Sequence, residues 1–177
     1  MSPAEAAGIV PEHVLAFEPG AAGRFARAVP TRARAATVSA MTAMTPDEIH
    51  AFLRETRIAK LAYLQEAGAP TIVPVWFEWD GHVARVFTSR SSRKAGRIAE
   101  DPRVALSVEE PVGVRERWVT IEGECTFSDE GTVDLIARLA RRYYDEAAAE
   151  AAISSWTANP GMWVTLTIHP SQLRSSG

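Results

Sequence analysis

A group of hydroxyl and cationic side chains between Thr88 and Lys94 could hold a phosphate. The segment reads Thr-Ser-Arg-Ser-Ser-Arg-Lys, and Ser91 or Ser92 can cap a helix whose first turn carries Arg93 and Lys94. Cations at a helix N-terminus oppose the helix dipole, so this placement indicates an anion nearby. Backbone N–H groups, serine hydroxyls and two cations together suit a phosphate group. The alternative is an ordinary helix start with solvated basic residues.

The segment before this group predicts an unusual strand. Residues 70–79 read Pro-Thr-Ile-Val-Pro-Val-Trp-Phe-Glu-Trp, and both alternating faces are too apolar for a sheet with one wet side. Pro74 removes a backbone donor in mid-strand, which places the stretch at a sheet edge or against a bound group. The alternative is a core strand that tolerates proline. Asp80-Gly81 predicts a two-residue hairpin into a strand that ends in Phe87 and Thr88.

Further elements must position these residues. Thr45-Pro46-Asp47-Glu48 predicts a capping box at the start of a short amphipathic helix. Strands are expected at 58–64, 103–109, 117–127 and 162–168, and a single helix at 129–149. Trp118 falls on the polar face of its strand, which indicates an interface or a ligand contact; the alternative is a scattered surface aromatic. Cys125 falls on the apolar face and is interpreted as buried rather than nucleophilic.

Length and composition exclude several classes of protein. A chain of 177 residues predicts one domain, residues 44–177, preceded by a flexible extension at 1–43 that is rich in Ala, Pro and Gly. The net charge of −3 argues against a nucleic-acid surface. The single cysteine excludes an internal disulfide and favours the reducing cytoplasm. No stretch is apolar enough to suggest a membrane span, and the four histidines lack metal-ligand spacing.

The order of these features resembles the pyridoxamine 5'-phosphate oxidase-like family of flavin and deazaflavin enzymes. The resemblance runs from about Thr45 to Phe127 and includes the Asp-Gly turn, the Phe-Thr strand end, Ser-Arg-Lys and Asp-Pro-Arg-Val. It implies a mainly β fold with α, an FMN-binding split β-barrel with flanking helices. In the family the apolar strand lies along the isoalloxazine ring, and the Phe-Thr and Ser-Arg-Lys groups hold the cofactor phosphate. The cofactor-binding residues implied here are Val73, Pro74, Val75, Trp76, Phe77, Phe87, Thr88, Ser92, Arg93, Lys94 and Trp118.

The resemblance implies an oxidoreductase that passes hydride between a bound deazaflavin or FMN and a small unsaturated or carbonyl-type substrate. No catalytic acid or base is assigned. The oxidase itself begins its cofactor strand with arginine and ends it with lysine, where this chain has residues near Ile72 and at Phe77. Residues 162–177 contain no Arg-x-His motif, so pyridoxamine phosphate oxidation is not expected. The Pro-Val-Trp-Phe run followed by Trp-Asp-Gly is more similar to the deazaflavin branch, which favours F420 over FMN.

A competing class is a non-catalytic split barrel that binds flavin or haem for storage or sensing. A histidine on the cofactor strand or beside Lys94 would favour it, whereas His82 falls in the hairpin turn. A purely structural barrel would leave Arg93 and Lys94 unexplained. A homodimer with two equivalent sites at the subunit interface is predicted from the doubly apolar strand, Trp118 and the aromatic-rich tail that contains Trp156 and Trp163. No nucleic-acid or membrane partner is expected.

Overall fold

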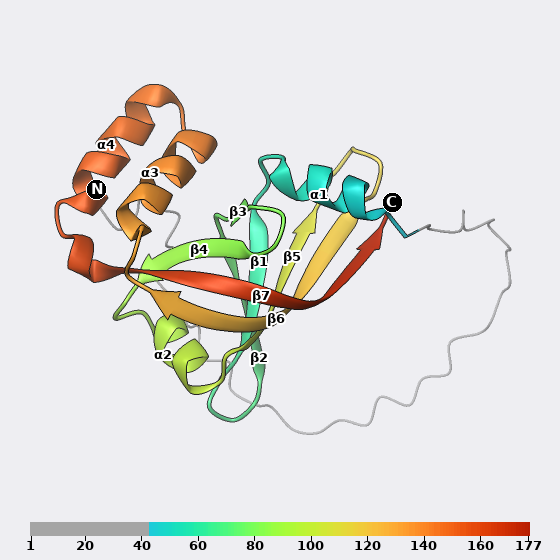
Figure 1. Cartoon of the computed structure of the whole chain (residues 1–177), viewed down its shortest axis with the longest axis horizontal. Helices are drawn as coiled ribbons and strands as arrows, with labels where there is room; N and C mark the ends of the chain where they lie inside the picture. Colours follow the sequence, from blue (N-terminus) through green and yellow to red (C-terminus); the bar gives the residue numbers. More distant parts are fainter. Residues whose placement is uncertain (1–42) are drawn as a thin grey trace, which may run out of the picture. The chain divides into compact units, whose positions relative to one another are not determined.

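One curled antiparallel sheet of seven strands organises residues 43–177, the part of the chain that the computed structural model describes (Figure 1). Residues 1–42 of the predicted extension lie outside this part. The strand order is β2-β1-β5-β6-β7-β4-β3. The strands are β1 Ala59–Leu64, β2 Pro70–Val75, β3 Glu78–Trp79, β4 Ala84–Ser89, β5 Arg103–Glu109, β6 Trp118–Ser128 and β7 Trp163–Ser176. The curled sheet with its surrounding helices agrees with the predicted split barrel.

Helices lie on several sides of the sheet (Figure 1). They are α1 Pro46–Arg54, α2 Arg93–Glu100, α3 Thr132–Tyr143, α4 Glu146–Thr157 and the short 3-10 helix Pro160–Met162. The capping box predicted for α1 is confirmed, because Thr45 accepts a bond from the Glu48 backbone while the Glu48 carboxylate accepts one from the Thr45 N–H at 2.7 Å. Helices α3 and α4 follow β6 and precede β7 in the sequence, and they pack against each other.

The core lies inside the curl of the sheet. Alternate residues of each strand point inward, as the period of two requires. The inward residues of β1, β5 and β6 include Ala59, Leu61, Tyr63, Val104, Leu106, Val108, Val119 and Ile121, all buried. Helix α1 adds Phe52 and Leu53 to this core, and α2 adds Ile98. Cys125 is buried as predicted, and burial raises the pKa of its thiol to about 12.

The predicted strand 70–79 is interrupted. It ends as β2 at Val75 and resumes as β3 at Glu78, so Trp76 and Phe77 lie between the two. The physical reason is a contact from α3, whose Tyr143 hydroxyl meets the backbone of Phe77 where a neighbouring strand would otherwise bond it. The expectation for Pro74 is confirmed, because β2 is an edge strand whose hydrogen-bonded neighbour in the sheet is β1.

The prediction of a single helix at 129–149 is wrong, because two helices form there. The chain leaves α3 at Tyr144, and the Asp145 side chain then accepts a bond from Ala148 N at 2.9 Å, which starts α4 as a new capped helix. Strand β7 also extends past the predicted end at Ile168, because β6 pairs with it along its whole length to Ser176.

The hairpin predicted at Asp80-Gly81 forms, shifted by one residue. Trp79 pairs with Ala84, and Asp80 N donates to Val83 O at 3.3 Å, which leaves Gly81 and His82 at the tip. The Asp80 carboxylate accepts bonds from His82 N at 2.8 Å and Val83 N at 2.9 Å, and this side-chain turn stabilises the connection. Strand 117–127 follows its prediction as far as Cys125, whereas Phe127, expected inward, is exposed. The register shift between Glu122 and Gly123 lies within this strand.

Candidate functional site

The N-terminus of α2 carries the hydroxyl groups of the candidate phosphate site. Ser92 is the N-cap, and its Oγ accepts a bond from Ala95 N at 3.2 Å. The same Oγ lies 3.3 Å from Oγ1 of Thr88, which is buried at the end of β4. Ser89 and Ser91 form a second hydroxyl pair at 3.1 Å. Because β4 runs into α2 with three residues between, four hydroxyls lie near the first backbone N–H groups of the helix, which have no backbone partner within it.

Two cations occupy the first turn of the same helix, and that turn contains no acidic residue. Arg93 is exposed, and within residues 43–177 no carboxylate forms an ion pair with it. Lys94 is half-buried. Arg97, in the last turn, is instead paired with Glu100 at 2.8 Å. The structure thus brings Thr88, Ser92, Arg93 and Lys94 together; this group, with the N-terminus of α2, is called the phosphate cradle below.

The outer edge of β2 offers backbone groups for a flat ligand. A bond from Gln65 N to Ala69 O sets the register of the β1–β2 hairpin. By alternation, the backbone groups of Val73 and Val75 face β1, while those of Ile72 and Pro74 face the open edge. Ile72 provides an N–H and a C=O there, whereas Pro74 provides a C=O alone. The edge therefore suits a ring that carries both a donor and acceptors.

Trp76 and Phe87 lie in an aromatic cluster beneath α3 and α4 rather than in the phosphate cradle. The Trp76 and Phe87 ring centroids are 6.5 Å apart, and Trp156 lies 5.9 Å from the first and 5.7 Å from the second. Neighbours on a strand point to opposite faces, so Phe87 packs against the helices while Thr88 points to the cradle. The side chain of Phe77 is fully buried in the core, which leaves its backbone for any contact with a ligand.

Trp118 lies far along the sheet from Phe87 and the phosphate cradle within one chain. It pairs with Ser176 at one end of β7, whereas Phe87 pairs with Thr165 near the other end. At about 3.3 Å per residue, these two levels of β7 are roughly 35 Å apart along the strand. A role for Trp118 beside the cofactor stays a prediction.

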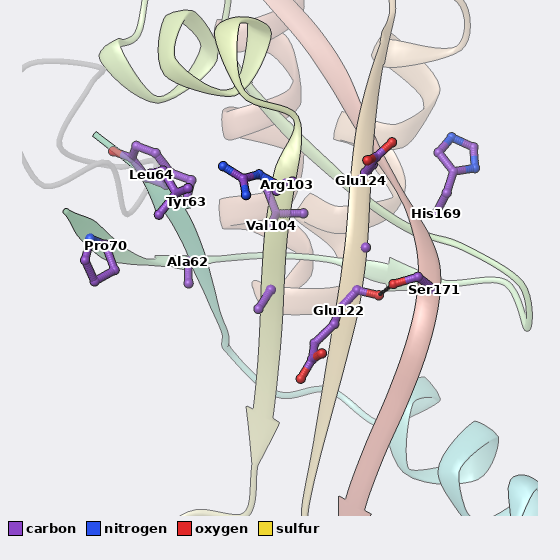
Figure 2. A pocket seen from close by; sticks show the side chains of 12 residues that line it. Ala62, Tyr63, Leu64, Pro70, Arg103, Val104, Glu122, Glu124, His169 and Ser171 are labelled. Carbon is purple, nitrogen blue, oxygen red and sulfur yellow. Dashed lines mark hydrogen bonds between the residues drawn. The ribbon is translucent and has the colours of Figure 1, made fainter. Parts of the chain in front are cut away.

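A hollow that the sequence interpretation missed lies on the outer face of β1, β5, β6 and β7. It encloses about 600 Å³, and none of the predicted cofactor residues lines it. Figure 2 shows Arg103, Glu124 and His169 around one end, and Glu122 with Ser171, whose hydroxyl donates to the Glu122 carbonyl, at the other. Its floor contains small residues, Ala62, Ala105 and Gly123. Ala62 and Ala105 face each other across β1 and β5, a pairing that sequence alone does not reveal.

Residues 43–177 contain neither a cluster of metal-ligating side chains nor a helix that could span a membrane. No three or more His, Cys, Asp or Glu side chains gather there as they would to hold a metal ion. None of the helices in that range is long and apolar enough to cross a membrane.

Comparison with known proteins found a matching family model, a similar sequence and several solved structures of similar fold. The sequence model of the pyridoxamine 5'-phosphate oxidase family matches residues 45–173. An F420H(2)-dependent biliverdin reductase from Mycobacterium tuberculosis (strain CDC 1551 / Oshkosh) is 31% identical over 112 residues, which cover 61% of this chain and 78% of the relative.

Two solved structures share the fold at lower identity. An F420 reductase superimposes with a TM-score of 0.58 at 23% identity, over 70% of this chain and 94% of its own. The haem storage protein HutZ from Vibrio cholerae gives a TM-score of 0.58 at 17% identity, over 74% of this chain and 94% of its own. Because one fold serves both proteins, the residues of the site must decide between cofactors.

Proposed function

Since the chain belongs to the pyridoxamine 5'-phosphate oxidase family, we propose that it is an oxidoreductase that transfers hydride between bound F420 and a small unsaturated or carbonyl-type substrate. FMN is the alternative cofactor. The phosphate cradle at the start of α2 is the observation that carries the proposal, because it combines hydroxyls, a helix N-terminus and two cations. The relative at 31% identity, which is named for F420H(2), supports the deazaflavin over FMN.

The residues present fit a phosphate-bearing, flat cofactor. Ser92 and Thr88 would donate hydroxyl hydrogen bonds to phosphate oxygens, and Arg93 and Lys94 would neutralise the charge. The open edge of β2 would orient the ring through the backbone of Ile72 and its neighbours. When bound, the deazaflavin ring supplies the hydride chemistry, so the protein need only bind, orient and shield it.

Two positions argue against a phosphorylated pyridoxamine as substrate. Ile72 is 65% exposed on the edge strand and Phe77 is fully buried, and neither side chain can bind a phosphate. These are the positions near which the oxidase carries arginine and lysine. We therefore place the substrate among small molecules other than a phosphorylated pyridoxamine that carry a carbonyl or a conjugated double bond.

The storage alternative lacks support from the described histidines. His50 Nδ1 accepts a bond from Trp79 Nε1 at 3.1 Å, and His169 Nε2 lies 2.8 Å from the Thr126 hydroxyl. His82 lies in the β3–β4 loop. None of the three is on β2 or in the first turn of α2, where it could ligate a haem iron placed over the cofactor strand. The likeness to HutZ at 17% identity concerns the fold alone.

The proposal is tested by removing the cations. Charge-assisted contacts to phosphate contribute about 1.5–3 kcal/mol each, so Arg93→Ala and Lys94→Ala should each weaken F420 binding roughly tenfold to a hundredfold. Fluorescence titration measures the affinity, and circular dichroism confirms that the fold is intact.

Arg97→Ala is the matched control. Arg97 is on the same helix, but it is paired with Glu100 in the last turn and should leave the affinity within about twofold. Equal affinities for F420 in all three variants and the wild type would contradict the phosphate cradle.

A further inference from the structure

The interruption between β2 and β3 is held by one side chain from α3. The Tyr143 hydroxyl donates to Arg57 O at 2.7 Å and lies 3.4 Å from both the N and the O of Phe77. Sheet pairing is broken at this point, so the hydroxyl provides a polar partner that the sheet does not. Burial raises the pKa of Tyr143, so the hydroxyl keeps its proton at neutral pH and remains a donor.

The ring of the same residue fixes the plane of Trp76. The two rings stack with centroids 4.9 Å apart and an interplanar angle of 3°. Tyr144 packs against Trp76 in a T-shaped arrangement, with the two ring centroids 4.8 Å apart. Trp76 directly follows Val75, the last residue of the strand whose open edge we assign to the cofactor ring. Tyr143 therefore controls both the backbone and the side chain at the end of that strand.

Two arginines hold this part of α3 in place. Arg138 makes a two-pronged contact with the Glu78 carboxylate, with bonds of 2.8 and 2.7 Å. Arg142 donates to Arg54 O at 3.0 Å and lies over the Phe77 ring at 5.6 Å. With contacts on both sides, the helix presents Tyr143 to the break from a fixed position, which is what precise placement of a site residue requires.

We propose that Tyr143 is a positioning residue for the cofactor ring, acting through Trp76. Its hydroxyl fixes the backbone at Phe77, and its ring keeps the Trp76 indole in the orientation that borders a ring bound along β2. The inference rests on the proposed function, because it concerns the ring half of the same site. It assigns Tyr143 no contact with the cofactor itself.

Tyr143→Phe tests this role because it keeps the stacked ring and removes the hydroxyl. A lost hydrogen bond of about 0.5–1.5 kcal/mol corresponds to roughly a twofold to tenfold weaker affinity for F420. Inorganic phosphate should compete with an unchanged inhibition constant, since the phosphate cradle is untouched. Tyr143→Leu removes the ring stacked on Trp76 as well and should weaken F420 binding further. In a Trp76→Phe background this additional loss should be small, because the two rings act as one unit.

Thr132→Val is the control. It removes another buried hydroxyl of α3, one bonded to Thr165 at 2.8 Å, and should lower the melting temperature without changing F420 affinity. Wild-type affinity in Tyr143→Phe, a parallel loss of phosphate binding, or an additional loss from Tyr143→Leu that is undiminished in the Trp76→Phe background would each overturn the positioning role. If the wild-type protein bound neither F420 nor FMN, the proposed function itself would fail, and the inference with it.

Discussion

At the scale of single residues, members of the phosphate cradle differ in how much they contribute to the fold. Thr88 is 4% exposed and its hydroxyl lies 3.3 Å from that of Ser92, so its substitution should change stability as well as ligand affinity. Arg93 is exposed on the first turn of α2. Exposed cations contribute little to stability, so we expect substitution of Arg93 to change ligand affinity far more than the free energy of unfolding.

Glu110 shows the opposite behaviour, because its charge serves the fold. Its side chain is 5% exposed and accepts bonds from Arg57 Nε at 3.0 Å and Arg117 Nε at 2.9 Å. Burial alone would raise the pKa of this carboxyl, but the hydrogen bonds from Arg117 and Arg57 outweigh burial and hold the pKa below its ordinary value of 4.5. The ionised form is therefore stabilised in the folded state.

Glu110→Gln should destabilise the protein by about 1.5–3 kcal/mol, because it removes the buried carboxylate that pairs with both Arg57 and Arg117 and leaves Arg57 with the exposed Glu55 as its counter-charge. Since the folded pKa is depressed, the stabilisation from Glu110 is present above about pH 4.5 and is lost as pH falls through the folded value. Urea denaturation between pH 7 and pH 3 measures both effects.

Glu109→Gln is the neighbouring control. Its side chain is 54% exposed and pairs with Lys60, so it should change the unfolding free energy by less than about 0.5 kcal/mol. Equal losses in the two variants would show that Glu110 has no special role.

At the scale of elements, signals local in sequence predicted local structure well. The capping box at Thr45, the Ser92 cap and the edge position of Pro74 each depend on a few adjacent residues. The β2–β3 break depends on Tyr143, which is 66 residues from Phe77, and no local pattern contains it. The break between α3 and α4 was readable, because Asp145 followed by Glu-Ala-Ala is a helix-start signal.

The β6 bulge gives a prediction at the same scale. A Cβ at Gly123 would lie 2.0 Å from the His169 carbonyl oxygen, so alanine there must displace the β7 backbone. Gly123→Ala should lower the free energy of unfolding by about 3 kcal/mol. Gly96→Ala, in the interior of α2 with nothing within 4 Å of its Cβ, should raise it by up to about 1 kcal/mol.

Urea denaturation of both glycine variants measures whether each substitution raises or lowers the free energy of unfolding. A Gly123→Ala protein as stable as the wild type would contradict the close approach of β6 and β7. A destabilised Gly96→Ala protein would contradict the open surroundings of that helix position.

At the scale of the whole molecule, two uncovered features point to a second copy of the chain. The outer face of β1, β5 and β6 carries the hollow floored by Ala62, Ala105 and Gly123, and the β2 edge exposes Ile72. Small residues allow another backbone to approach closely. Trp118 is half-buried on the polar face of β6, where a large aromatic side chain favours an interface. We propose a homodimer with two equivalent cofactor sites between the subunits.

Light scattering at micromolar concentration should therefore show twice the mass of one chain. Ala105→Arg places a long charged side chain on the hollow's floor and should give a folded monomer with F420 affinity reduced at least tenfold. Ala147→Arg, the same substitution on the exposed part of α4, should remain dimeric and bind normally. A monomeric wild-type protein that binds F420 at full stoichiometry would refute the shared site.

Titration of the purified wild-type protein with F420, FMN and haem tests the central claim most directly. We predict that F420 binds most tightly, at one molecule per chain, with a change in the absorbance of its ring, and that FMN competes for the same site. Tighter binding of haem than of either flavin-type cofactor, or no binding of F420 and FMN at all, would contradict the assignment as a deazaflavin-dependent oxidoreductase.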